Sequence, residues 1–507
     1  MIEIIESSQI IKKEENTVAE AKVKIETAEQ KEKRKAKETR QLEKLIKERN
    51  RPKIPGYYAY FIVIIAIVYI VDEVASQIGT QMQSVIASQL FAPIFGEEVA
   101  VARMSLIGQI SLAAYILAML YKPLSDKYGR RPFLIINTLG MAVGMFLIGV
   151  STGIPVYLIG TLVVAFFVPH DMQAIYIQEC APAEKRATTY SVIKAISTLG
   201  MFLIPLFRRM FIPGSDLTNW RMVYLAPAVI GVIVVVFAIF FVRESDVFLD
   251  NKIRQLKMTD EEREAEAHSA DQKTAEGGII HAGKYIFKHK QLFWISIVAG
   301  VVGFGAVIPS YYETVMSYGY AQQFIGEGMT LGQAVTSGLA IPYVNKALTL
   351  FAIGSAICQF IPGFIADAIG RKKAVLCMSA AAIVSYVLFW IGCNRMMNPY
   401  LVGAFAGLAV GAHWASGDLV ALLSTESSPT NLRASIETTR VIISYVISLI
   451  STIGSIVLIN LLGDAKIAVV CLIIALLGYV VGIALMMFKV KDTKGIDMST
   501  VSAKDFE

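Results

Sequence analysis

Long apolar stretches separated by short polar segments dominate the sequence. About twelve of these stretches have the roughly 20 residues that an α-helix needs to cross a lipid bilayer. They lie at residues 57–80, 103–122, 131–152, 155–178, 187–207 and 220–242 in the first half, and at 291–318, 345–366, 372–393, 399–425, 434–461 and 466–488 in the second. The pattern therefore predicts an all-α membrane protein with twelve transmembrane helices.

Charged residues gather in three segments that divide the chain. Residues 1–54 are rich in Lys and Glu and predict a charged cytoplasmic helix, residues 244–290 predict a cytoplasmic linker, and residues 490–507 predict a cytoplasmic tail. Between these segments lie two apolar regions, 55–243 and 291–489. We expect each of them to form a bundle of six helices.

The distribution of Lys and Arg predicts the orientation in the membrane. The formal net charge is +6, and basic residues crowd residues 1–53 and the connections after the second and eighth spans, whereas connections 81–102 and 319–343 contain none. Basic loops remain in the cytoplasm, so both termini are expected there, in a multi-pass protein of the plasma membrane. The basic excess thus reflects sidedness and not nucleic-acid binding. Three residues on the opposite side are exceptions to this rule: Arg208, Arg209 and Arg221.

Two pairs of short motifs recur at nearly constant separation. "DKYGRRP" begins at Asp126 and "DAIGRKK" at Asp367, 241 positions later (367 − 126). "ECAPAEKRA" begins at Glu179 and "ESSPTNLRA" at Glu426, 247 positions later (426 − 179). The chain therefore consists of two related halves, an organisation typical of secondary transporters, whose substrate site lies between the halves.

These four loops predict a gate at the cytoplasmic edge of the membrane. Ion pairs between helix ends can hold two halves together and can be exchanged for water when that side opens, and glycines permit the tight turns. The alternative is that the charges only set the orientation. The predicted gate residues are Asp126, Gly129, Arg130, Arg131, Glu179 and Arg186 in the first half, and Asp367, Gly370, Arg371, Lys372, Glu426 and Arg433 in the second.

The repeated loops also resemble a known family. "KPLSDKYGRR" and "GFIADAIGRK" are similar to the signature loop of the major facilitator superfamily. "VPHDMQAIYIQECAPAEKRA", "RESDVFL" (243–249) and "KDTKGIDM" (491–498) resemble segments of its sugar-porter and metabolite:proton symporter branch. The resemblance covers about residues 55–490, and it implies a fold of two pseudo-symmetric six-helix bundles that works by alternating access.

Four carboxylates lie inside the apolar stretches, where ionisable groups need a functional or structural reason. Asp72 and Glu313 are 241 positions apart (313 − 72), and Asp171 and Asp418 are 247 apart (418 − 171), which repeats the loop offsets. The resemblance implies that their helices, the first, fourth, seventh and tenth, line a central cavity. Several carboxylates in one poorly hydrated cavity cannot all be ionised at low cost, so we predict proton exchange, first of all at Asp72. The neighbouring Glu73 points about 100° away on an ideal helix. The alternative is that each acid is a structural ion-pair partner or lies at the aqueous rim.

Two basic residues lie about two turns into the fifth and eleventh spans, at Lys194 and Arg440. The resemblance implies that Lys194 replaces a sugar-contacting Gln of sugar porters, and that "YYETVM" replaces a Gln pair on helix seven. A fixed ammonium or guanidinium beside carboxylates suits a charged or zwitterionic organic solute. The alternative is that both bases serve only as partners of Glu437 or of the gate acids.

We therefore interpret the chain as a secondary active transporter that moves a small charged or zwitterionic metabolite by proton-coupled symport. The alternatives are a proton-coupled drug or metabolite exporter, a sugar porter-like uniporter and, in a different class, a non-transporting membrane sensor. No convergent nucleophile–base set indicates an enzyme. The expected partners are the small-molecule substrate, protons and the lipid bilayer, and we expect a monomer without cofactor, metal or nucleic acid.

Overall fold

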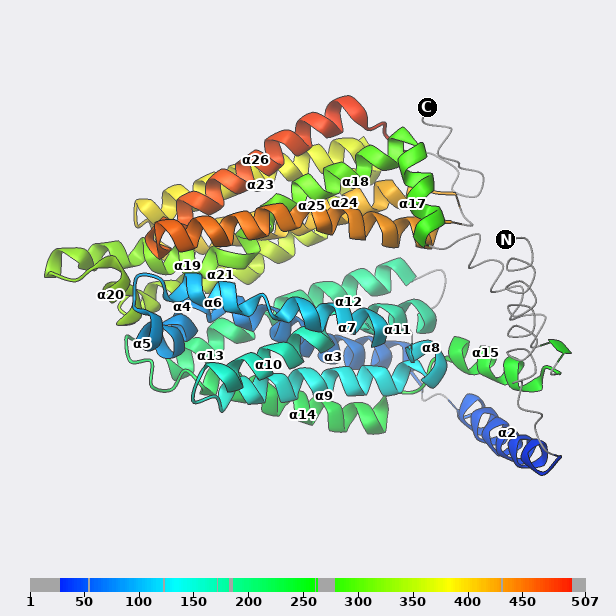
Figure 1. Cartoon of the computed structure of the whole chain (residues 1–507). Helices are drawn as coiled ribbons and strands as arrows, with labels where there is room; N and C mark the ends of the chain where they lie inside the picture. Colours follow the sequence, from blue (N-terminus) through cyan, green and yellow to red (C-terminus); the bar gives the residue numbers. More distant parts are fainter. Residues whose placement is uncertain are drawn as a thin grey trace, which may run out of the picture. The chain divides into compact units, whose positions relative to one another are not determined.

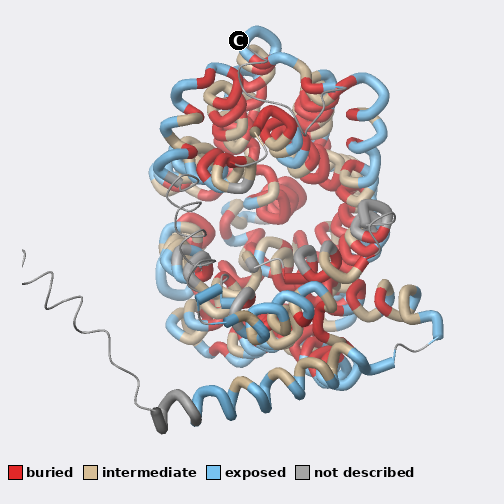
Figure 2. The backbone as a smooth tube through the Cα atoms, turned by 90° about the vertical axis from the view of Figure 1, so that its right-hand side faces the viewer, coloured by how far each residue is buried: buried red, intermediate tan, exposed pale blue. Residues whose placement is uncertain are grey.

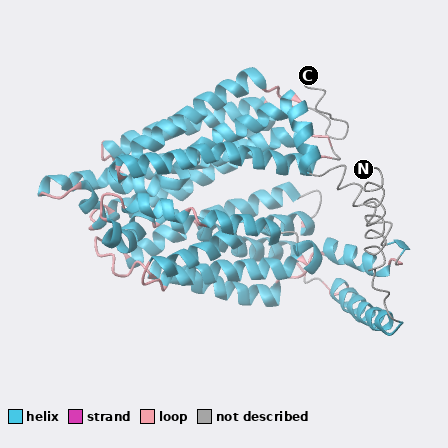
Figure 3. Cartoon of the chain, viewed as in Figure 1, coloured by secondary structure: helices cyan, strands magenta, loops and turns pink. Residues whose placement is uncertain are grey.

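The computed structural model describes residues 28–52, 55–121, 124–170, 172–181, 186–259, 261–262, 279–429 and 432–494. Every regular element in this part of the chain is helical (Figure 3), and it contains no strand. The prediction of an all-α fold is confirmed. The chain divides into two compact units, one of residues 1–54 and 246–264, the other of residues 55–245 and 265–507.

The smaller unit joins the charged N-terminal helix to the start of the central linker. Helix α2 (Ala28–Arg49) contacts α15 (Asp246–Lys257). The Arg49 Nε donates to the Asp250 Oδ1 at 2.7 Å, and the Arg49 Nη1 lies 3.5 Å from the Asp246 carboxylate. These charges are partly exposed, so each pair contributes little to stability.

The larger unit contains the two apolar halves (Figure 1). The first half comprises α3 (Tyr57–Gln81), α4 (Gln83–Ile86), η1 (Ala87–Phe91), α5 (Ala92–Phe95), α6 (Ala100–Gly108), α7 (Ser111–Tyr121), α8 (Leu124–Tyr128), α9 (Arg130–Gly149), α10 (Ile154–Phe167), η2 (Val168–His170), α11 (Met172–Cys180), α12 (Arg186–Gly200), α13 (Leu203–Phe211) and α14 (Met222–Phe241).

The second half follows the same order of long helices. It comprises α17 (Ile279–Lys288), α18 (Lys290–Val302), η4 (Gly303–Ala306), α19 (Val307–Ala321), η5 (Gln322–Glu327), α20 (Leu331–Thr336), α21 (Ile341–Phe360), α22 (Pro362–Ile369), α23 (Arg371–Asn394), α24 (Pro399–Glu426), α25 (Arg433–Leu462), η6 (Asp464–Lys466) and α26 (Ile467–Lys489).

Within the described residues, nine helical runs are long and apolar enough to cross a membrane. A tenth is formed if the helices of 83–95 and 100–115, which meet at a bend of 100°, count as one span. These runs agree with a multi-pass membrane fold, while the count of twelve stays a prediction.

The remaining predicted spans are broken into shorter helices for local reasons. The fourth changes to a 3₁₀ turn at η2, where Pro169 has no amide hydrogen to donate to a helical ladder. The fifth breaks between α12 and α13, where the amides of Met201 and Phe202 bond three residues back instead of four. Such 3₁₀ geometry interrupts a helix without ending the span.

Small residues allow α24 to pack closely on α21. Gly403, Gly407 and Gly411 lie four residues apart on one face of α24, and a Cβ atom on them would lie 1.7, 2.2 and 2.6 Å from carbonyl oxygens of α21. Glycine at this spacing lets membrane helices approach closely. The contact fixes the position of α24, whose C-terminal half carries His413 and Asp418.

Large apolar side chains remain exposed on the outside of the larger unit, as lipid contact requires. Val229, Ile233 and Phe240 of α14 and Ile450 and Leu461 of α25 are each at least half exposed. Figure 2 shows buried segments on the inner sides of the helices and exposed segments on their outer sides. The polar residues described next are found inside.

Candidate functional site

A cavity of about 670 Å³ lies between the two halves, and we call it the charged cavity. Helix α3 contributes five residues of one face on one side, and α24 and α25 contribute most of the other side. The polar and charged residues that line it are Tyr69, Asp72, Glu73, Ser76, Gln77, Lys194, Gln359, His413, Trp414, Asp418, Arg440 and Ser444.

Lys194 forms an ion pair with Glu73 on the first-half wall of the charged cavity. Its Nζ also donates to the Tyr69 hydroxyl at 3.2 Å and lies 4.7 Å from the centre of the Tyr69 ring. The Lys194 side chain is 31% exposed and that of Glu73 is 10% exposed. Because the ammonium still faces the cavity, an incoming anionic group can compete with Glu73 for it.

Arg440 is paired on the opposite wall with Glu437, one turn earlier on α25. The Arg440 Nε donates to the Glu437 Oε2 at 2.9 Å. The alternative predicted for Arg440, an ion pair with Glu437, is therefore observed. Arg440 nevertheless lines the charged cavity, so the cation of this pair forms part of its wall.

Two of the four predicted carboxylates meet in the charged cavity. Asp72 lines it from α3 with 6% of its surface exposed, and Asp418 lines it from α24 as an exposed residue. Asp171 lies outside the described residues. Glu313 is not among the lining residues, because its carboxylate faces an arginine of the other half.

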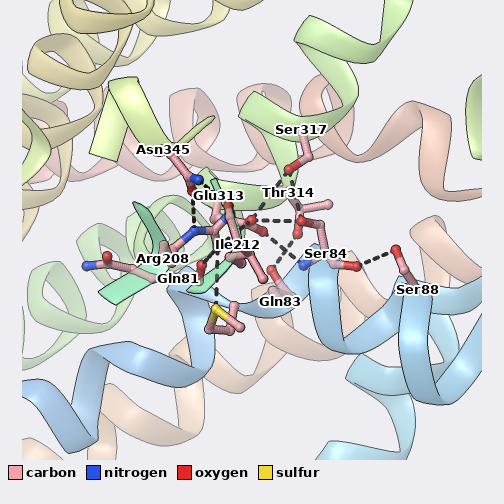
Figure 4. A network of polar contacts seen from close by, with 11 residues as sticks. Gln81, Gln83, Ser84, Ser88, Arg208, Ile212, Glu313, Thr314, Ser317 and Asn345 are labelled. Atoms are coloured by element: carbon pink, nitrogen blue, oxygen red, sulfur yellow. Dashed lines mark hydrogen bonds and ion pairs between the residues drawn. The ribbon is translucent and has the colours of Figure 1, made fainter. Parts of the chain in front are cut away.

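Glu313 of α19 and Arg208 of α13 form a fully buried ion pair between the two halves (Figure 4). Both side chains are 0% exposed, and the Arg208 Nη1 lies 3.1 Å from the Glu313 Oε1. Ser84 donates to the same carboxylate from its backbone amide at 2.9 Å and from its hydroxyl at 2.7 Å. The Arg208 Nε donates to the Asn345 Oδ1 at 2.7 Å, and Nη1 also donates to the Gln81 carbonyl. We call this set of residues the buried lock.

The buried lock is stable only while its two halves are in contact. Two buried charges lose their hydration, and their mutual attraction offsets that loss only when further hydrogen bonds satisfy both groups. Here serine and asparagine supply such bonds from both halves, and among the described residues only the Arg208 Nη2 of this ion pair has no partner. Breaking such a pair by removing one partner costs about 3 to 5 kcal/mol.

A second contact joins the halves at the same end of the bundle. The Asp464 carboxylate, between α25 and α26, accepts from the backbone amides of Val101 at 2.7 Å and Ala102 at 2.9 Å. These amides belong to the first turn of α6, where backbone N–H groups lack helical partners and a negative charge is favourable. We call the end with the buried lock and Asp464 the contact end.

The repeated loops lie at the opposite end, which we call the loop end. In the first half, Arg130 forms an ion pair with Glu179 at 2.9 Å, and its Nη1 donates to the Ser125 hydroxyl at 3.2 Å. The backbone amides of Arg130 and Arg131, at the start of α9, donate to Glu244 at 3.0 and 3.1 Å.

The second half repeats this arrangement. Arg371 forms an ion pair with Glu426 at 3.0 Å and with Asp367 at 3.0 Å, and its backbone amide donates to Asp492 at 3.1 Å.

The ion pairs described at the loop end thus join helices of the same half. They differ from the expected ion pairs, which would join the two halves. The described contacts between the halves include the buried lock and Asp464 at the contact end, and a 3.3 Å hydrogen bond from Thr198 of α12 to Gln359 of α21.

The backbone conformation and a close carboxylate explain why glycine occupies both loop positions. Gly129 and Gly370 have φ angles of +114° and +98°, which favour glycine. A Cβ atom on Gly129 would lie 2.4 Å from a Glu244 carboxylate oxygen, and one on Gly370 would lie 2.4 Å from an Asp492 carboxylate oxygen. Glycine therefore lets each carboxylate reach the first amides of the following helix.

Comparison with known proteins fits this paired architecture. Residues 57–346, more than half of the chain, match the family model of the Major Facilitator Superfamily. The chain belongs to this superfamily. The resemblance of the repeated loops is thereby confirmed.

Relatives of this superfamily member carry the names of transporters and not of enzymes. The glucose transporter GlcP of Staphylococcus epidermidis is 25% identical over 287 residues, which cover 53% of this chain and 59% of the relative. Facilitated glucose transporter member 2 of Gallus gallus is 30% identical over 122 residues, which cover 22% of each chain. The matched regions thus span less than two thirds of these relatives.

Solved structures of the superfamily share the fold over most of the chain. A D-xylose–proton symporter has a TM-score of 0.59 at 13% identity, covering 87% of this chain and 99% of that one. The nucleoside transporter NupG, solved as a single-residue mutant, has a TM-score of 0.59 at 15% identity, covering 84% and 100%. At such identity the likeness shows the fold alone.

The other predicted gate residues have partners within their own half, or their side chains lie outside the described part of the chain. Arg433 donates to the carbonyls of Thr425 at 3.1 Å and Ser428 at 3.2 Å. Lys372 donates to the Met487 carbonyl of α26 at 2.8 Å, and Arg131 donates to the Ile239 carbonyl of α14 at 2.5 Å. The side chains of Asp126 and Arg186 are outside the described residues.

Sequence reasoning missed the roles of Arg208, Glu73 and the two helix-capping acids. The sequence did mark Arg208 as unusual, because it is a basic residue on the side of the membrane where few Lys or Arg residues are expected. Glu244 and Asp492 also carried a signal, because "RESDVFL" and "KDTKGIDM" place them 248 positions apart (492 − 244), close to the offsets of the loops. Glu73 carried no signal beyond its position beside Asp72.

We predict that Gly370→Ala destabilises the second half by about 2 kcal/mol, because it combines left-handed strain with a weakened helix cap. Thermal unfolding in detergent measures the effect. Gly363→Ala in α22 is the matched control, since no atom lies within 4 Å of its added Cβ. Equal melting temperatures for the two variants would contradict the capping role of Asp492.

We predict that Glu313→Gln separates the halves at the contact end, because it leaves the Arg208 charge buried without its counter-charge. Spin labels at Asn219 and Gln322, both exposed, should report a longer distance distribution by double electron–electron resonance. Ser317→Ala is the control, since it removes a 3.0 Å contact to Ser84 and keeps both charges. Unchanged distances in Glu313→Gln would rule out a locking role.

Proposed function

We propose that this protein is a secondary active transporter that couples the uptake of a small charged or zwitterionic organic metabolite to proton movement. The observation that carries the proposal is the charged cavity between the two halves. Its described lining holds three carboxylates, two bases and a histidine. A site of this composition suits a solute that brings ionic groups of its own.

Lys194 argues against a neutral sugar as the cargo. The names of relatives and structural neighbours refer to glucose, xylose and nucleosides. In this chain an ammonium occupies the charged cavity beside Glu73. A neutral sugar would leave the Lys194–Glu73 pair unchanged, whereas a carboxylate or ammonium on the cargo can exchange with one of its members.

Proton coupling is proposed at Asp72. This acid lies next to Glu73 on α3, and both line the charged cavity. When cargo draws Lys194 away from Glu73, two adjacent carboxylates remain near each other, and a proton on Asp72 relieves their repulsion. Cargo and proton would therefore enter together, which is symport.

The position of the contacts supports a mechanism of alternating access. In this structure the halves are held together at the contact end by the buried lock and Asp464. Opening that end requires both contacts to break and to become hydrated, while the ion pairs inside each half at the loop end can persist. We infer that the loop end faces the cytoplasm and that the protein lies in the plasma membrane as a monomer.

A sugar porter-like uniporter is the second candidate. The relatives named as glucose transporters favour it, as does Trp414, which lines the charged cavity together with the amides of Gln77 and Gln359. Indole and amide groups can stack on and hydrogen-bond a neutral hexose. This candidate predicts uptake that is independent of a pH gradient.

We predict that Asp72→Asn abolishes accumulation of cargo driven by a pH gradient in proteoliposomes and preserves exchange of labelled for unlabelled cargo. Exchange needs binding and reorientation but no net proton movement. Asp216→Asn, at an exposed acid outside the charged cavity, is the control and should keep both activities. Full gradient-driven accumulation by Asp72→Asn would refute the proton assignment.

We predict that Lys194→Gln weakens binding of the charged cargo at least about tenfold, the effect of losing one charge-assisted hydrogen bond. Isothermal titration of the detergent-purified protein measures it. Lys346→Gln, at an exposed lysine outside the charged cavity, should leave affinity unchanged. Tight hexose binding that Lys194→Gln does not alter would favour the uniporter instead.

A further inference from the structure

A second cavity of about 380 Å³ adjoins the charged cavity, and the two share Ser76 and Val168 as lining residues. Its walls come from both halves, chiefly α3, α6, α7 and α10 on one side and α19 and α25 on the other. All its lining residues belong to the described part of the chain, and none of them is Asp, Glu, Lys, Arg or His. We call this space the neutral compartment.

Helix α3 orders the two spaces along the path to the contact end. Asp72 and Glu73 line the charged cavity, Ser76 lines both spaces, and Gly79 and Thr80 line the neutral compartment. Glu73 and Gly79 are six residues apart, or about 9 Å along the helix axis. A molecule of ordinary metabolite length can therefore reach both spaces at once.

The walls of the neutral compartment combine aromatic faces with hydroxyl groups. Tyr115, Tyr157, Tyr224 and Tyr311 line it from four different helices. Tyr224 is fully buried, and among the described residues its hydroxyl has no hydrogen-bond partner. A buried hydroxyl without a partner is costly, and tyrosine faces suit flat or ring-shaped groups.

The compartment is also left open by the residues around it. Gly79 and Gly108 both line it, and an added Cβ atom on either would meet nothing within 4 Å. The close packing of other inward-facing glycines, such as Gly403, shows that this openness is not general. Interior space lined by hydroxyl and aromatic groups is typical of a ligand site.

We propose that the neutral compartment binds an uncharged ring of the cargo while the charged cavity binds its ionic group. This inference rests on the proposed transport function and narrows its substrate class. The cargo is a conjugate in which an ionic group is joined to a ring that carries hydroxyl or amide groups. A compact ion fills the charged cavity only and leaves the neutral compartment empty.

Three glycine variants test the assignment because each adds the same side chain at a position with open space. Gly79→Leu fills the neutral compartment, Gly417→Leu fills the charged cavity, and Gly454→Leu lies in neither lining. None of these glycines has an atom within 4 Å of its added Cβ. Differences between the variants therefore report on the space that each one fills.

The probes are metabolites sorted into three classes and screened by thermal shift and titration. Alanine represents the ionic group alone, glucose the uncharged ring alone, and tyrosine and glucosamine the two joined. We expect the tightest binder to come from the joined class. Gly79→Leu should weaken that binder at least tenfold and leave its ionic fragment within threefold, Gly417→Leu should weaken both, and Gly454→Leu neither.

Two kinds of result would overturn the proposal. The neutral compartment is refuted as a ring site if the tightest binder comes from either single-group class. It is also refuted if Gly79→Leu does not weaken binding of the joined compound. In both cases the proposed transport of a charged cargo still stands. Absence of binding and of transport for every class refutes the proposed function itself, and this inference with it.

Discussion

The Arg208–Glu313 ion pair is the constraint on which the arrangement of the larger unit depends. One half supplies the cation and the other the anion, both fully buried. Neither charge can remain in a dry interior without its partner. The two halves must therefore meet closely at the contact end, and the charged cavity is confined to the space between that contact and the loop end.

Contacts within the halves repeat, whereas contacts between the halves do not. In the first half, Arg130 pairs with Glu179 and its backbone amide donates to Glu244. In the second half, Arg371 pairs with Glu426 and its backbone amide donates to Asp492 in the same way. The buried lock and the Asp464 contact have no such internal copy among the described contacts between halves. Duplicated contacts connect helices within each half, and the unduplicated ones determine how the halves meet, which suits motion at that interface.

The fold could be predicted from the sequence because it follows local rules, whereas the sequence predicts loop ion pairs between the halves and the structure has them within each half. Apolar length predicts membrane helices, and the repeated motifs predict paired halves. The assignment of Glu313 to the cavity failed because an offset in sequence specifies an equivalent helix but not the direction in which a side chain points. Arg208 shows the same limit, since only three-dimensional packing reveals that the anion opposite it lies 105 residues away.

Helix α3 connects the two cavities and the buried lock. Its residues follow one another in this order: Asp72 and Glu73 line the charged cavity, Ser76 lines both cavities, and Gly79 and Thr80 line the neutral compartment. At its end, the Gln81 carbonyl belongs to the buried lock. Gln83 links the last two, because it lines the neutral compartment and accepts a hydrogen bond from Thr314, one residue after Glu313. On the proposed function, a cargo ring beside Gln83 would compete for this contact. Occupation of the site would then weaken the contact end directly, without requiring a signal through the rest of the protein.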